Sequence, residues 1–278
     1  MLREFPSELS FNAIFVISSL DENQQGTTRR IVEDLEVYAR ISDIYLEVDE
    51  PRSATQFRSA FGNIRGKMPS GVGAILHLDM HGSIDRGLHI AGSNEFISWA
   101  ELSRLCAALN LHMKNNLLLL SPVCHSVQMV RHIDMSKNVP FNVFIASKDE
   151  IESGFIADNF MPFYRHLVDA GNVIQSFDEC LASKMLMVQS EKIFLVGMAR
   201  YFRHKCFGNG GRQRREALLT EVLKAHPNNR KNRRRYRSAI KSHISPRPEI
   251  FERYATTFLC GRKPSYTFAD VVDFARVT

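Results

Sequence analysis

Val72-Gly-Ala-Ile-Leu-His-Leu-Asp-Met80, followed by His81-Gly82, is the stretch that decides the fold. A second apolar run, Leu117-Leu-Leu-Leu-Ser-Pro-Val123, leads in the same way into Cys124-His-Ser126. Largely apolar runs of this length are typical of parallel strands that are buried on both faces. Functional groups of open α/β sheets lie at the carboxyl ends of the strands. The two runs therefore predict that a histidine and a cysteine meet at one edge of a sheet.

Strands and helices alternate along most of the chain. Strands are expected at 12–18, 43–48, 72–80, 117–123 and 141–146, with a sixth at 192–196. Apolar residues at helical spacing predict helices over 27–40, 53–65, 98–111, 153–170 and 174–187. A small hairpin of 87–91 and 95–97 interrupts the alternation. The pattern predicts a three-layer α/β fold, in which a mostly parallel six-stranded sheet is flanked by helices.

Composition narrows the class of protein. The 278 residues are 44% hydrophobic, which is enough for a sizeable core. No apolar run approaches the roughly 20 residues of a membrane-spanning helix, so we expect no membrane partner. The first residues include an acid and a proline and no signal-type apolar segment, which favours the cytoplasm. The five cysteines lack framework spacing, and His204 and Cys206 have no second ligand pair, so we expect reduced thiols and neither metal nor cofactor.

Charge is distributed unevenly. Between Arg203 and Arg247 there are 14 Lys and Arg against 2 Asp and Glu, whereas the rest of the chain has 22 against 28. With Gly208-Asn-Gly-Gly211 as a boundary, we expect one α/β domain over 1–207 and a basic, mainly helical extension over 208–278.

The extension contains a dense arginine cluster. A helix from about 230 would carry four of these side chains on one face, namely Arg230, Arg233, Arg234 and Arg237. Guanidinium groups bind phosphate through paired hydrogen bonds, so this face is a candidate for RNA or other nucleic acid. An acidic protein partner and a purely solvated face are the alternatives.

Several blocks together resemble a known family. Leu76–Gly82 resembles a His-Gly block, Glu95–Leu102 a short strand and helix opening, and Leu118–Ser126 a nucleophile block. Phe160–Tyr164 resembles a Phe-Tyr helix that follows the fifth strand. In this order they resemble the caspase-like cysteine peptidase superfamily (clan CD), most of all its CHAT branch, which is related to caspases and separases. The similarity spans about residues 10 to 200.

The resemblance implies a caspase-like peptidase domain over 1–207 in which His81 and Cys124 form a catalytic dyad. The sulfur of Cys124 would attack a peptide carbonyl and His81 would give a proton to the leaving amine. The family points to the backbone N–H groups of Gly82 and Cys124 as the oxyanion hole. A helix that starts just after Cys124 would favour the thiolate. The alternative for Cys124 is a small buried apolar residue.

Three acidic residues are candidates for binding substrate. Asp79 stands two positions before His81 and is expected to orient a loop, to line the cleft or to form a structural salt bridge. Asp149 and Glu150 follow the fifth strand, where this superfamily builds part of its substrate pocket. Related metacaspases carry an acidic residue two positions before the cysteine, whereas this chain has Pro122 there. His77 lies inside a strand and is expected to be structural.

The sequence therefore favours a cytoplasmic cysteine endopeptidase that cleaves a protein substrate. The charge asymmetry suggests control by a regulatory protein or a nucleic-acid signal at the basic extension. Families of this type include bacterial antiviral defence effectors, a role implied by the resemblance alone. The alternative function is a catalytically inactive caspase-like adaptor that binds RNA or a protein through the arginine-rich segment.

Overall fold

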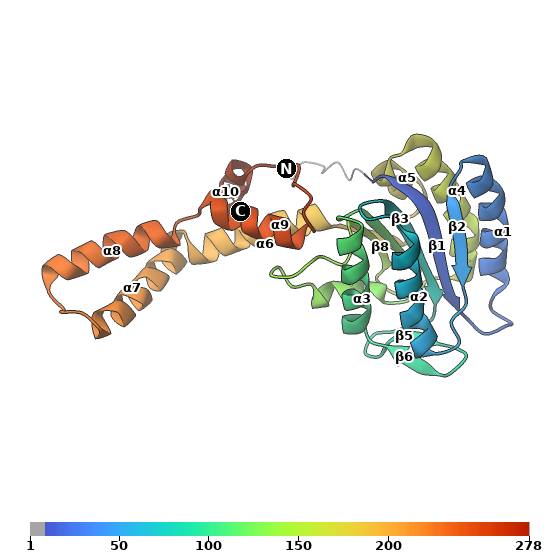
Figure 1. Cartoon of the computed structure of the whole chain (residues 1–278), viewed down its shortest axis with the longest axis horizontal. Coiled ribbons are helices and arrows are strands. Elements are labelled where there is room, and N and C mark those ends of the chain that lie inside the picture. The colour runs from blue at the N-terminus through green and yellow to red at the C-terminus, as the bar shows by residue number, and fades with distance from the viewer. Residues whose placement is uncertain (1–8, 278) are drawn as a thin grey trace.

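A computed structural model describes residues 9–277 and is built around one six-stranded sheet (Figure 1). The strand order is β2-β1-β3-β7-β8-β9. The first five strands along that order pair in parallel, and β9 is antiparallel to β8. Their bounds are β1 (Phe11–Ser19), β2 (Tyr45–Asp49), β3 (Gly73–Met80), β7 (Leu117–Ser121), β8 (Val143–Ser147) and β9 (Met185–Gln189). The expected mostly parallel six-stranded sheet is confirmed.

The two strands that decide the fold lie side by side in the middle of this sheet. His77 of β3 is in register with Leu120 of β7. Every residue of both strands is buried, which explains why both runs are almost wholly apolar rather than alternating. Parallel pairing brings the residues after Met80 and after Ser121 to the same edge of the sheet.

Helices cover both faces, which makes three layers. One face packs against α1 (Gly26–Ile41), α4 (Ser153–Ala170) and α5 (Val173–Cys180). The other packs against α2 (Ala54–Lys67) and α3 (Trp99–His112). Ser53 and Ser98 cap α2 and α3 through their side chains, which accept from backbone N–H groups of the first turn. The chain runs from β1 out to β2 and returns beyond β1 to β3, so connections diverge between β1 and β3, the usual place for a ligand site.

The last strand differs from the expectation. The sixth strand is Met185–Gln189, and the segment 192–196 belongs to α6 (Ser190–Lys205). The helix expected over 174–187 ends at Cys180. The apolar run after 192 is helical because its buried residues recur one turn apart, at Phe194, Met198 and Phe202.

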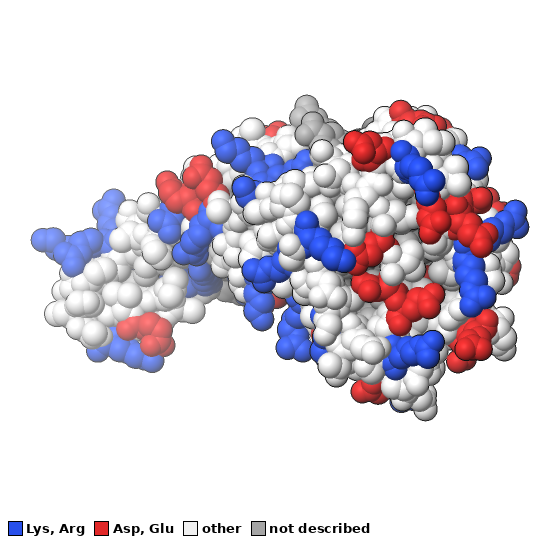
Figure 2. Space-filling model, turned by 45° about the vertical axis from the view of Figure 1, so that its right-hand side comes forward, with Lys and Arg blue, Asp and Glu red and all other residues white. Residues whose placement is uncertain are grey.

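The carboxyl-terminal quarter, from residue 208 onward, is helical and divides into two parts. α7 (Gly208–Lys224) and α8 (Arg230–Ile244) form an antiparallel hairpin that projects from the body, here called the arm (Figures 1 and 2). α9 (Pro248–Phe258) and α10 (Phe268–Val277) return and bury Phe251, Phe258 and Val271 with Phe194 of α6. Both helices pack against α6, so this part of the predicted helical extension belongs to the body. No helix among residues 9–277 is long and apolar enough to cross a bilayer.

Candidate active site

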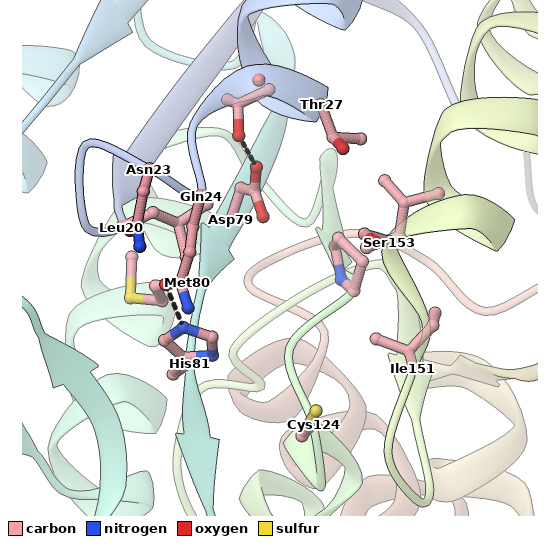
Figure 3. Close-up of a pocket in the computed structure, with 14 residues that line it drawn as sticks. Leu20, Asn23, Gln24, Thr27, Asp79, Met80, His81, Cys124, Ile151 and Ser153 are labelled. Atoms are coloured by element: carbon pink, nitrogen blue, oxygen red, sulfur yellow. Dashed lines mark hydrogen bonds between the residues drawn. The ribbon is translucent and has the colours of Figure 1, made fainter.

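A cavity of about 470 Å³ opens at the carboxyl edge of the sheet. Loops after β1, β3, β7 and β8 all contribute to it. Figure 3 shows Asp79, Met80 and His81 on one side, Cys124 at the base, and Ile151 and Ser153 opposite. The lining contains one imidazole, one thiol and one carboxylate, and no lysine or arginine. Nowhere in residues 9–277 do three His, Cys, Asp or Glu side chains gather as a metal site would require.

The chain brings His81 and Cys124 together through a backbone contact. A Cβ placed on Gly82 would lie 2.1 Å from the carbonyl oxygen of Cys124 and 2.6 Å from a methyl carbon of Val123. Only glycine allows so close an approach. The segments that carry the base and the thiol are therefore packed against each other, and both side chains line the cavity (Figure 3). Among the described residues no hydrogen bond joins His81 to Cys124, and what the two side chains share is the wall of this cavity.

His81 is held at both its backbone and its ring. The N–H of His89 donates to the carbonyl oxygen of His81 at 2.9 Å. Nε2 of the ring lies 2.6 Å from Oε1 of Gln24. Because an amide oxygen can only accept, Nε2 carries the hydrogen and Nδ1 is left as an acceptor. Figure 3 shows Nδ1 on the side of the ring that is turned toward the cavity.

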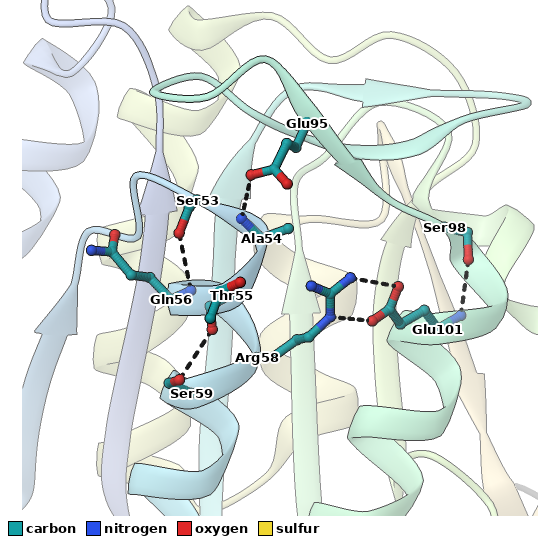
Figure 4. A network of polar contacts seen from close by, with 9 residues as sticks. All are labelled: Ser53, Ala54, Thr55, Gln56, Arg58, Ser59, Glu95, Ser98 and Glu101. Atoms are coloured by element: carbon teal, nitrogen blue, oxygen red, sulfur yellow. Dashed lines mark hydrogen bonds and ion pairs between the residues drawn. The ribbon is translucent and has the colours of Figure 1, made fainter.

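A small sheet supports the loop that follows His81. It consists of β4 (Gly82–Ser83), β5 (Gly87–Ile90) and β6 (Glu95–Ile97). Figure 4 shows that Glu95 accepts from the backbone N–H of Ala54, which joins this sheet to the start of α2. Arg58 of α2 in turn makes a paired contact with Glu101 of α3, at 2.6 and 3.3 Å. The histidine thus belongs to a braced unit rather than a loose loop.

A serine closes the turn that carries Cys124. The hydroxyl of buried Ser126 donates to the carbonyl oxygen of Ser121 and accepts from the N–H of Ser147, each at 2.9 Å. It therefore joins the ends of β7 and β8 around the cysteine. His125 has φ 63°, and Nδ1 of its ring lies 3.3 Å from the carbonyl oxygen of Lys148, so the ring is engaged with the end of β8.

A helix does begin just after Cys124 and runs to His132, as expected, but it is a 3-10 helix and not an α-helix. This helix, η1, spans Ser126–His132, and the left-handed His125 separates it from Cys124. An α-helix dipole therefore does not act on the thiol from this segment. In this turn the N–H of His125 donates to the carbonyl oxygen of Asp149 at 3.3 Å.

Asp79 lines the cavity and also anchors a helix. It is 7% exposed, and the hydroxyl of Thr28, in the first turn of α1, donates to its carboxylate. Burial raises the pKa of Asp79, although Thr28 and the charge of His81 oppose that shift. Asp79 therefore lines the cleft, as one expectation had it, but its buried partner is a hydroxyl group and not the basic side chain of a salt bridge.

Asp149 and Glu150 occupy a different position from Asp79. Neither belongs to the cavity lining, to which their loop contributes Ile151 and Ser153 instead. The carbonyl oxygen of Asp149 accepts from the N–H of His125 and from the hydroxyl of Ser147. Asp149 therefore supports the cysteine turn through its backbone carbonyl. The carboxylates of Asp149 and Glu150 are not part of the cavity lining.

His77 is a structural residue of β3. It is 2% exposed, its Nδ1 lies 2.8 Å from the hydroxyl of Tyr164, and its ring stacks on that of Tyr164. Burial lowers the pKa of His77 to about 3, so it is neutral in the folded chain. It points to the face covered by α4, and the expectation that it is structural rather than catalytic agrees with this burial.

Sequence reasoning missed the contribution of the loop after β1. Gln24, Thr27 and Thr28 line the cavity, and Gln24 holds the ring of His81. One signal was available, because the polar stretch Asp21–Gly26 follows the first expected strand and must emerge at the same edge as His81.

The four predicted arginines lie on α8 of the arm, away from the cavity. Arg237 makes a paired contact with Glu216 of α7, at 2.6 and 3.0 Å. Its guanidinium therefore joins the two helices, and Arg230, Arg233 and Arg234 form the exposed part of the predicted face.

Protein-family models and curated proteins were compared with this chain. No protein-family model matches the sequence, and no curated protein matches it. The argument for function therefore depends on the geometry of the cavity.

Gly82→Ala is expected to disrupt the site. The added methyl group meets the carbonyl of Cys124, so we expect the free energy of unfolding to fall by about 1–3 kcal/mol. Urea unfolding measures this change. Gly62→Ala in α2 is the matched control. An added Cβ there has no atom within 4 Å apart from the neighbouring backbone of its own helix, so this variant should be neutral or slightly stabilising. Equal stability of Gly82→Ala and the wild type would contradict the close contact.

His77 should make the fold sensitive to acid. The unfolded chain takes up a proton at this imidazole near pH 6.5, whereas the folded chain does so only near pH 3. Stability present above pH 6.5 is therefore lost as the pH falls, by up to about 1.4 kcal/mol per pH unit. His77→Gln should remove this component from urea unfolding between pH 6.5 and 4, and His132→Gln, at an exposed position, should not. A wild-type slope in His77→Gln would show that the ring is not buried neutral.

Proposed function

We propose that this chain is a cysteine endopeptidase of the caspase-like, CHAT-related type, with His81 and Cys124 as its catalytic dyad. The observation that carries the proposal is the packing of Gly82 against the carbonyl of Cys124, with both reactive side chains on one cavity. The three-layer architecture and the mostly parallel sheet are compatible with such a fold.

The proposed reaction uses Nδ1 of His81 as the base and the sulfur of Cys124 as the nucleophile. Nδ1 of His81 removes the proton from the sulfur of Cys124, and the sulfur then bonds to the carbonyl carbon of the scissile peptide. The C–N bond breaks, the protonated imidazole returns its proton to the leaving amine, and a thioester remains on Cys124. Water, deprotonated by His81, then cleaves the thioester and releases the acid and the thiol. Backbone N–H groups of Gly82 and Cys124 are the candidates for holding the oxyanion.

Gln24 gives this mechanism a positioning residue. Its amide oxygen accepts from Nε2–H of His81 and so keeps Nδ1 available for the thiol. Asp79 acts further back, because its contact with Thr28 fixes the start of α1, which the loop of Gln24 enters.

The charge of the cavity favours a substrate with a basic side chain. Asp79 is its one carboxylate, and no lysine or arginine lines it. A lysine or arginine of the substrate that reached Asp79 would find an opposite charge in a poorly solvated place. We therefore assign Asp79 as a substrate-binding residue, and Asp149 and Glu150 carry no part of this proposal.

Alkylation of the thiol tests the dyad directly. Iodoacetamide at pH 7 should react selectively at Cys124, because Cys106, Cys180 and Cys260 are buried and partial burial raises the pKa of the Cys206 thiol. His81→Ala should slow that reaction at least tenfold and abolish cleavage of a peptide library, since general base catalysis contributes about 100-fold or more. Mass spectrometry of the labelled chain gives the rate and the position.

Two control variants complete this experiment. Cys124→Ala should lose both labelling and cleavage, whereas Cys206→Ala, which removes a thiol outside the cavity, should keep both. Labelling of Cys124 at the same rate with and without His81, together with no cleavage of the library, would instead favour the inactive adaptor.

Asp79→Asn should weaken the preference for basic side chains. Asparagine keeps the size of the side chain and can still accept from Thr28, but it lacks the charge. Selectivity for lysine or arginine over glutamine in a peptide library should fall about tenfold or more, the value of a charged hydrogen bond. Asp85→Asn, an exposed acid outside the cavity lining, should leave selectivity unchanged. A wild-type enzyme that prefers acidic or apolar residues would overturn this assignment.

A further inference from the structure

The arm is a two-helix unit with its own small core. Leu219 of α7 and Ile240 and Ile244 of α8 are buried between the helices, and Tyr236 packs against them. At 1.5 Å per residue, α7 makes the arm about 25 Å long. The large exposed apolar side chains of residues 9–277 all lie outside 208–245. The arm therefore uses its apolar groups internally and presents a polar surface.

That surface is strongly positive. Residues 208–245 contain 11 Lys and Arg and 2 Asp and Glu. Both acids are already engaged, Glu216 with Arg237 and Glu221 with Lys224. In the view of Figure 2, blue side chains project from the edges of the arm.

Four neighbouring cations of α8 remain uncommitted. Arg230, Lys231, Arg233 and Arg234 are exposed, and none forms an ion pair or side-chain hydrogen bond with another described residue. Arg230 and Arg234 are one turn apart, so their side chains leave the helix from the same face. Such a row offers several guanidinium groups to anions that repeat along a line.

We propose that the arm binds the phosphate backbone of a nucleic-acid duplex without reading its sequence. Interfaces with nucleic acid are polar and positively charged, whereas protein interfaces depend on apolar and aromatic anchors, which the described arm does not expose. Single strands are bound by stacking on aromatic rings, but Tyr236 packs within the arm and against His226. Phosphate contacts alone suit a duplex.

This proposal is independent of peptidase activity and is tested on the full chain. Fluorescence anisotropy with a 20-base-pair duplex should give a Kd of about 10⁻⁶–10⁻⁴ M near physiological salt. Replacing Arg230, Arg233 and Arg234 together by glutamine should weaken binding about tenfold or more. It should also reduce the slope of log K against log salt by about 2.7, because about 0.9 is lost per phosphate contact.

A variant of equal charge provides the control. Arg30, Arg40 and Arg65 are exposed on α1 and α2 of the body, and their joint replacement by glutamine removes the same three charges. It should leave the affinity and the slope close to those of the wild type. Thermal melting followed by circular dichroism should show that both triple variants stay folded, since glutamine is a good helix former.

The nucleic acids compared decide the source of the phosphates. Duplex DNA and duplex RNA of equal length are measured side by side, and tighter binding of either one supports the proposal and identifies the duplex. Tighter binding of a single strand, or of polyglutamate at equal charge, overturns it in favour of stacking or of an acidic protein partner. Equal weakening by the body variant also overturns it, since net charge alone would then explain binding.

Discussion

The close approach of Gly82 to the carbonyl of Cys124 is the constraint on which the site depends. It follows from the pairing of β3 with β7 at the centre of the sheet, where parallel strands deliver their next residues to the same edge. A side chain at position 82 would separate the two segments, and the histidine and cysteine would then no longer share a cavity. The cavity shared by the two residues therefore depends on the absence of a side chain at position 82.

Polar contacts from four strand ends refine that arrangement. Ser126 joins the ends of β7 and β8 under the thiol, and Gln24 fixes the hydrogen of His81 on the ring nitrogen that it contacts. Asp79 accepts a buried hydrogen bond from Thr28, although burial raises the pKa of its carboxyl group. A carboxyl group buried beside a cavity is costly in free energy unless it is hydrogen-bonded, and Thr28 supplies that hydrogen bond here.

The carboxyl-terminal quarter of the chain consists of two parts that use their apolar side chains differently. α9 and α10 bury aromatic side chains against α6 and complete the body. In the arm, the few apolar side chains are buried between its own two helices. What the arm presents to solvent is charge. The cavity at the sheet edge and the cationic arm thus lie on separate structural units of one chain, so a partner can occupy the arm without entering the cavity.

The sequence alone determined the parallel sheet, the two central strands, and the placement of His81, Gly82 and Cys124 at one edge, because long buried apolar runs leave few other folds. It also located the arginine cluster. It could not assign 192–196, since a short apolar run suits a strand or a helix until its neighbours are known. Only tertiary structure showed that Gln24 and Thr28 belong to the site, that Asp149 contributes its backbone, and that Arg237 pairs with Glu216. These depend on side chains that meet across distant segments, which local patterns do not encode.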